Sequence, residues 1–129
     1  MSKGEGEKPT MTTAAERNLA SAEAYYQAMN GKDLAGMARN LHPDVRFISP
    51  LADLNGKQAV LDAAKRLLTL LKSVGVQAKF GSESQAMLTY DLDFAEPIGI
   101  CRTAALMTFK DGLIARIELF FDARPFGKN

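Results

Sequence analysis

The chain has 129 residues, of which 47% are hydrophobic and 24% are charged, and its formal net charge is +1. This length and balance predict one globular domain with a substantial apolar core. No basic run is longer than Lys65-Arg66, and no apolar run approaches the ~20 residues of a membrane helix, so we expect neither a nucleic-acid nor a membrane partner.

The N-terminal segment and the cysteine count indicate where the protein works. Residues 1–12 begin with the polar stretch MSKGEGEKPT, which predicts a disordered extension, and Met11 offers a second start. The chain opens without the pattern of a secretory signal. Cys101 is the single cysteine, which excludes an internal disulfide and a cysteine-based metal cluster. We therefore expect a cytoplasmic protein with no metal and no other cofactor.

Two helices are predicted at the start of the ordered chain. Thr13 and Glu16 have the spacing of a capping box, and apolar side chains recur at helical intervals from there to the stop at Gly31. Asp33 can cap a second, shorter helix that runs through Leu41. A proline two residues further on ends this helix, because proline disfavours a helical residue before it.

A short strand, a loop and a third helix follow. Residues 45–49 alternate in character and predict a strand with Phe47 and Ser49 on one face. Residues 50–56 end in a turn-forming Asn-Gly pair and predict a loop. Apolar residues at helical spacing then predict a helix over 57–72.

The remainder of the chain predicts strands joined by turns. The turn pair Asp111-Gly112 between two apolar runs is a strong hairpin signal. Three helices followed by an antiparallel meander indicate an α+β domain. The four predicted strands cover residues 76–83, 86–95, 99–109 and 113–122.

Four segments, in this order, resemble the SnoaL-like branch of the nuclear transport factor 2-like superfamily. They are NGKDLAGMARNLHPDVRFISP, LNGKQAVLDAAKRLL, YDLDF and TAALMTFKDGLIARIELFFD. The resemblance covers Ala15 to about Pro125. It implies a cystatin-like α+β fold, in which a cone-shaped, curved antiparallel sheet wraps around the N-terminal helices and leaves an apolar pocket. We expect a single SnoaL-like domain over residues 13–126.

The superfamily includes ketosteroid isomerases and polyketide cyclases, and the resemblance allows the isomerase residues to be compared one by one. An isomerase of this type uses an Asp base, a Tyr donor and a neutral carboxylic acid. The tyrosine position falls on Tyr25 and matches. The base position falls on Ser49 and the acid position on Ala105, so both are lost. These losses argue against isomerase chemistry, because neither residue can replace a carboxyl group.

Four residues remain weak candidates for catalysis, and each has a structural alternative. Tyr25 can donate a hydrogen bond to a ligand or simply pack its ring. His42 has a suitable pKa for a base but falls in the predicted last turn of the second helix, where it can cap carbonyl groups. Asp53 and Asp122 can reach the pocket mouth or stand in water as ordinary loop and strand-end carboxylates.

The expected ligand is a small apolar or carbonyl-bearing molecule in a largely apolar pocket. Strand alternation and the resemblance assign its walls and polar contacts. The predicted ligand-binding residues are Tyr25, Phe47, Ser49, Leu88, Tyr90, Leu92, Thr103, Met107, Ile117, Leu119 and Phe121.

The opposite face of the predicted sheet mixes apolar and charged side chains. Ile100, Leu106 and Phe120 fall there beside Arg102 and Asp91. A face this apolar favours association, and the resemblance implies a homodimer through it.

Three functions stay open at this point. The first is a small-molecule-binding domain whose catalytic activity is not assigned. The second is an isomerase, cyclase or hydratase-type enzyme acting on a small hydrophobic carbonyl compound. The third is a dimerisation or association module without a ligand.

Overall fold

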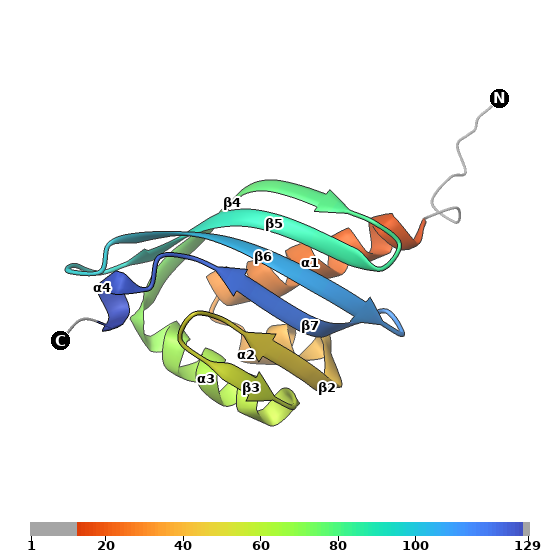
Figure 1. Ribbon diagram of the computed structural model, residues 1–129, viewed down its shortest axis with the longest axis horizontal. Helices are drawn as coiled ribbons and strands as arrows, with labels where there is room; N and C mark the ends of the chain where they lie inside the picture. The colour runs from red at the N-terminus through yellow and green to blue at the C-terminus, as the bar shows by residue number, and fades with distance from the viewer. Residues whose placement is uncertain (1–12, 128–129) are drawn as a thin grey trace.

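A curved, unclosed sheet wraps around the N-terminal helices in the computed structural model, which describes residues 13–127 (Figure 1). The elements are α1 (Ala14–Asn30), α2 (Leu34–Arg39), β2 (Leu41–Ile48), β3 (Asp53–Asn55), α3 (Lys57–Leu70), β4 (Leu71–Gly81), β5 (Gln85–Phe94), β6 (Ile100–Lys110), β7 (Leu113–Phe120) and α4 (Arg124–Gly127). The six strands lie in the order β3-β2-β7-β6-β5-β4. The predicted α+β class is confirmed, whereas the predicted disorder of residues 1–12 lies outside the described residues.

The capping box that begins α1 is present as predicted. The Thr13 hydroxyl accepts a hydrogen bond from the Glu16 N–H at 3.1 Å, and the Glu16 carboxylate accepts one from the Thr13 N–H at 2.9 Å. Two N–H groups that a helix start leaves unpaired are thereby satisfied. At the other end the helix stops at Asn30, and the Gly31 N–H bonds to the Gln27 carbonyl.

Helix α1 runs along β4 and β5 on the concave side of the sheet. Its first turn touches the end of β4, where the Gly81 backbone leaves no room for a side chain against Ala15. Its last residue, Asn30, accepts a hydrogen bond from the Val74 N–H at 2.8 Å. Because Val74 pairs with Leu92 of β5, the helix ends at the level of Leu92, and the sheet continues beyond it.

The predicted alternation along the long strands is confirmed. Leu88 on β5, and Ala105 and Met107 on β6, are fully buried on the side that faces the helices. The hairpin between β6 and β7 is also as predicted. Asp111 and Gly112 both take positive φ values, 55° and 79°, which a two-residue turn of type I′ requires.

The end of α2 and the start of β2 differ from the prediction. The helix stops at Arg39 rather than Leu41, because the Asn40 side chain bonds to the Gly36 carbonyl and the Asn40 carbonyl bonds to the Ile114 N–H of β7. Leu41 and His42 therefore begin a strand. β2 pairs with β7 in parallel, so one pair departs from the predicted antiparallel arrangement.

The junction of α3 and β4 also comes earlier than predicted. The helix ends at Leu70 and the strand begins at Leu71, whose buried side chain lies opposite Phe94. The Lys32 ammonium group donates hydrogen bonds to the carbonyl groups of Leu68 and Leu71 and fixes the junction of α3 and β4. Burial of Leu71 in the sheet thus outweighs the helical propensity of the following residues.

The capping box yields a prediction for stability. Replacing Thr13 by Ala should lower the free energy of unfolding by about 1 kcal/mol, because the Glu16 N–H loses its acceptor. The Thr13→Ser variant keeps a hydroxyl and should stay close to the native stability. Urea denaturation of the two variants checks this, and equal losses in both would contradict the role of the hydroxyl.

Candidate functional site

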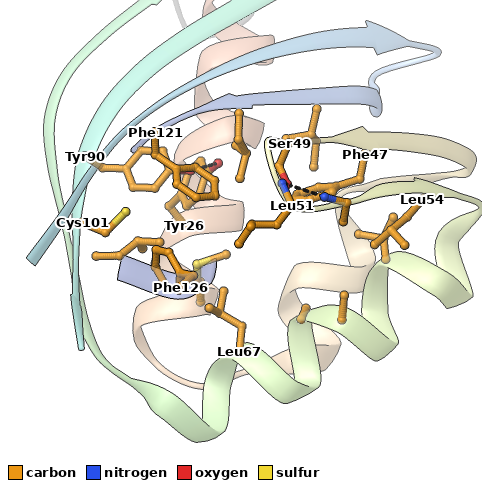
Figure 2. Close-up of a pocket in the computed structure, with 18 of the residues that line it drawn as sticks. Tyr26, Phe47, Ser49, Leu51, Leu54, Leu67, Tyr90, Cys101, Phe121 and Phe126 are labelled. Carbon is orange, nitrogen blue, oxygen red and sulfur yellow. Dashed lines mark hydrogen bonds between the residues drawn. The ribbon is translucent and has the colours of Figure 1, made fainter. Parts of the chain in front are cut away.

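A largely apolar cavity of about 260 Å³ lies between the concave face of the sheet and the helices (Figure 2). The inner face of the sheet forms one wall, α3 forms another, and Tyr25, Tyr26 and Met29 of α1 close a further side. Side chains from α3 include Val60, Ala64 and Leu67. The cavity lies beside the C-terminal half of α1, against β2, β7 and the parts of β5 and β6 next to the turn that joins them.

Five lining residues bring polar atoms to the cavity: Tyr25, Tyr26, Ser49, Tyr90 and Cys101. The others are apolar. Within residues 13–127, no charged side chain and no histidine lines this cavity. Its polar chemistry is therefore that of neutral hydroxyl groups and one thiol.

Tyr25 brings a hydroxyl group whose hydrogen-bonding capacity is unused. The side chain is buried, with 3% of its surface exposed, and burial raises the pKa of Tyr25 above its ordinary value. Its ring packs edge-on against Tyr26 with the centroids 5.2 Å apart. No hydrogen-bond partner for its hydroxyl group is found in the described part of the chain. The group is a neutral donor that an acceptor in the cavity would satisfy.

Tyr26 and Tyr90 form a coupled pair of phenols. Their hydroxyl oxygens are 2.9 Å apart, and their ring centroids are 4.3 Å apart. Burial raises the pKa of both groups above the ordinary value, so both stay neutral at physiological pH. One proton makes the bond between them. The hydroxyl group that accepts it keeps its own proton for a further acceptor.

Ser49 follows β2 and organises the turn into β3. Its Oγ accepts hydrogen bonds from the N–H groups of Leu51 and Ala52, each at 3.1 Å (Figure 2). The hydroxyl oxygen therefore has a local structural role in this turn. The hydroxyl proton is not used by these two bonds, and Ser49 also lines the cavity. It can hold the turn and donate to a ligand at the same time.

Cys101 lines the cavity on the sheet side, near Tyr90 (Figure 2). The thiol is free and buried, and burial raises its pKa. Its sulfur is 3.7 Å from the Thr103 hydroxyl group. A protonated thiol in apolar surroundings acts as a small hydrophobic group rather than as a nucleophile.

Seven of the predicted ligand-binding residues also line the cavity in addition to Tyr25, and they come from β2, β5 and β7 and from the segments that directly follow β2 and β7. These residues are Phe47, Ser49, Tyr90, Leu92, Ile117, Leu119 and Phe121.

The structure places three predicted ligand-binding residues elsewhere. Leu88, Thr103 and Met107 are almost fully buried but do not line the cavity. Leu88 lies opposite Ala105, in the part of the concave face that α1 fills. Alternation predicted their direction correctly but gave no information on which inward residues the helices cover.

The three candidate bases also lie outside the cavity lining. His42 is in β2 rather than in a helix, which corrects the prediction, and its Nδ1 accepts a hydrogen bond from the Asp44 N–H at 3.0 Å. Asp53 pairs with Arg46 at 2.8 Å, which lowers the pKa of the aspartate. Asp122 binds Arg124, whose hydrogen bonds lower the pKa of that carboxyl to about 2.

Several lining residues were not predicted from the sequence. Tyr26 and the α3 side chains appear in the sequence as helical stripes, which predict burial but not what they bury against. Leu51 lies in a predicted loop and Phe126 in α4, a helix that no pattern indicated. For Phe126 the signal available was its apolar character directly after the last strand.

Two other kinds of site find no support within residues 13–127. No group of three His, Cys, Asp or Glu side chains there is placed to hold a metal ion. None of the helices in that range has both the length and the apolar character needed to cross a bilayer.

Comparison with solved structures relates the fold to known proteins. A protein of Kribbella flavida is 28% identical, with a TM-score of 0.80, and the match covers 89% of this chain and 92% of that chain. A steroid delta-isomerase from Pseudomonas aeruginosa is 22% identical, with a TM-score of 0.69 and coverage of 82% and 80%. TerC, crystallised with polyporic acid, is 18% identical, with a TM-score of 0.73 and coverage of 85% and 95%.

Sequence comparison identifies the family. The search of curated proteins gives no match. The SnoaL-like domain family matches residues 22–117, which is most of the chain and includes both the helices and the sheet that form the cavity. On this evidence the protein belongs to the SnoaL-like domain family, within the nuclear transport factor 2-like fold.

Proposed function

We propose that this domain binds a small, neutral, apolar molecule that carries a hydrogen-bond acceptor such as a carbonyl group. The observation that carries the proposal is the composition of the cavity, in which apolar walls surround hydroxyl groups and no charge. An apolar cavity of about 150 Å³ holds one benzene molecule, which has six non-hydrogen atoms. The cavity of about 260 Å³ in this protein therefore corresponds to a ligand of about ten non-hydrogen atoms. A ligand with two fused rings has this size.

Three donors support an acceptor on the ligand. Tyr25 has an unused O–H, Ser49 keeps its proton, and the pair formed by Tyr26 and Tyr90 has one proton to spare. A buried polar group without a partner costs about 1–3 kcal/mol, and a ligand oxygen relieves that cost. A carboxylate would find no cation in the cavity and would lose its hydration, so the ligand is neutral.

Binding without proton transfer is the function that the cavity supports best. The steroid delta-isomerase and the TerC complex suggest two other activities for the fold, steroid isomerisation and the binding of polyporic acid. An isomerase, cyclase or hydratase of this type needs a base near the ligand. The candidates His42, Asp53 and Asp122 are engaged outside the lining, so we do not propose an enzymatic step.

We also propose that the chain forms a homodimer through the outer face of the sheet. Phe80, Met87, Ile100 and Phe120 are exposed there by 69%, 37%, 59% and 48% of their surfaces. Register places Phe80 beside Met87, and Phe120 beside an alanine of β6. Charged side chains of both signs flank this area, among them the ion pair between Arg102 and Asp91. A two-fold axis can therefore bring opposite charges of the two copies together.

Removing the Tyr25 hydroxyl group tests the proposed acceptor. Tyr25→Phe should weaken binding of 1-tetralone, a bicyclic ketone, by about 0.5–1.5 kcal/mol, because one hydrogen bond is lost. Binding of tetralin, which has the same rings without the oxygen, should not change. Isothermal titration of both ligands against both proteins measures the difference. An equal effect on the two ligands would show that Tyr25 does not contact the carbonyl group.

The neutral lining predicts binding that does not depend on pH. Burial raises the pKa values of Tyr25, Tyr26 and Tyr90 above the ordinary value of a tyrosine, so none of them exchanges a proton between pH 5 and pH 8. The Kd for 1-tetralone should therefore vary by less than about twofold over this range. A titration with a midpoint inside it would reveal an ionisable group at the ligand and revive the enzyme alternative.

A charge on the outer face tests the dimer. Phe120→Glu should convert a dimer into a monomer in sedimentation velocity, because two-fold symmetry places two copies of the carboxylate in one apolar interface. Leu70→Glu is the matched control, since Leu70 is 60% exposed but lies at the cavity mouth. That variant should remain dimeric. A native chain that sediments as a monomer would contradict the proposal directly.

A further inference from the structure

The chain after β7 folds back toward the cavity in a short, well-defined turn. Asp122 accepts hydrogen bonds from the Arg124 N–H at 3.0 Å and from the Arg124 guanidinium group. The N–H groups of Phe126 and Gly127 then bond to the Ala123 carbonyl group and close α4. Figure 1 shows α4 at the end of the molecule where α3 gives way to β4. This is the end at which the sheet extends past α1.

The ring of Phe126 enters the cavity from this turn. It packs edge-on against Phe94, with the centroids 5.5 Å apart and the planes at 84°, and against Phe121 at 5.7 Å and 72°. Both partners line the cavity. These two aromatic contacts hold the partly buried ring of Phe126 in a defined place.

Phe126 differs from the other aromatic walls in how the backbone holds it. Phe47, Phe94 and Phe121 belong to the strands of the sheet or directly adjoin them, whereas Phe126 comes from a four-residue helix outside the sheet. Leu51 and Leu70 also line the cavity and are more than half exposed, whereas Phe126 is partly buried. The ring of Phe126 therefore forms a shielding wall of the cavity at the end of the molecule where α4 lies.

We propose that Phe126 is a specificity-determining residue that limits the length of the ligand, an inference that rests on the proposed binding function. With the ring in place, the cavity accepts a neutral carbonyl compound of about ten non-hydrogen atoms. When the six ring carbon atoms of Phe126 are removed, the cavity extends toward solvent at the place that the ring had filled. Longer chains of the same chemical class then find apolar walls where the ring had been.

A homologous series of 2-alkanones tests this length limit. The Kd of each member, from 2-heptanone to 2-tetradecanone, is measured by titration calorimetry with the native full-length chain and with Phe126→Ala. In the native protein each added methylene should tighten binding about fourfold up to about 2-nonanone, after which the gain should cease. In Phe126→Ala the fourfold gain should continue for three or more further carbons.

Two further variants keep the test decisive. In Phe126→Leu the gain per added methylene should cease at a chain length between those of the native protein and Phe126→Ala; we call this chain length the break. The leucine variant retains enough apolar contact to fold if the alanine variant does not. Phe109→Ala removes an equal ring from a half-buried phenylalanine that does not line this cavity, so its break should stay at the native position. Melting temperatures establish that each variant is folded.

The outcomes separate this inference from the binding function itself. A break in the native protein that stays in place in both Phe126 variants would overturn the length limit and leave the binding function standing. Loss of all binding in folded Phe126→Ala would also overturn it, because the ring would then be a contact and not an end wall. Absence of binding across the series in every protein would overturn both proposals.

Discussion

The position of α1 on the concave face of the sheet decides which inward side chains form the core and which line the cavity. The helix starts against Gly81 at one end of β4 and stops where Asn30 bonds to Val74, level with Leu92. Under the helix, inward side chains of β5 such as Leu88 have no exposed surface, because α1 packs on them. Ile117 and Leu119 of β7 lie level with this part of the core but line the cavity instead. Core and cavity are thus built from the same alternating pattern, and coverage by α1 divides the inward residues into the two groups.

That geometry explains how much of the molecule was predictable from the sequence. The capping box at Thr13, the alternation on the strands and the turn at Asp111 depend on neighbours close in the sequence, and all three were predicted correctly. Which inward residues α1 covers depends on how the helix lies across the sheet, which alternation does not encode. For this reason Leu88 and Met107 could not be told apart from Leu92 and Ile117. His42 was assigned to a helix because its strand partner, β7, is about seventy residues away. Phe126 could not be assigned, because nothing near it in the sequence shows that its partners are Phe94 and Phe121.

The polar groups of the cavity define what chemistry it can support. A ketosteroid isomerase combines donors that stabilise an oxyanion with a base that moves a proton. This chain keeps the donor at Tyr25 and adds the pair formed by Tyr26 and Tyr90, but a serine and an alanine replace the two carboxyl groups. Hydroxyl donors in a dry cavity polarise a carbonyl group and fix its position. They do not accept a proton from carbon at neutral pH, because burial favours their neutral form and leaves protonation of a hydroxyl out of reach. The arrangement therefore favours recognition of a carbonyl group over its conversion.

Alternation along the strands also keeps the two proposed surfaces physically separate. On β6, Cys101 and Ala105 point inward, whereas Ile100 and Leu106 lie on the outer face. A substitution on the outer face leaves the walls of the cavity unaltered, and a substitution on the inner face leaves the outer surface unaltered. The one element that escapes this division is α4, since Phe126 reaches the cavity from outside the sheet. A change in the tail can therefore alter the shape of the cavity without disturbing either face. A substitution at Phe126 therefore changes the proposed limit on ligand length while both faces of the sheet stay as they are.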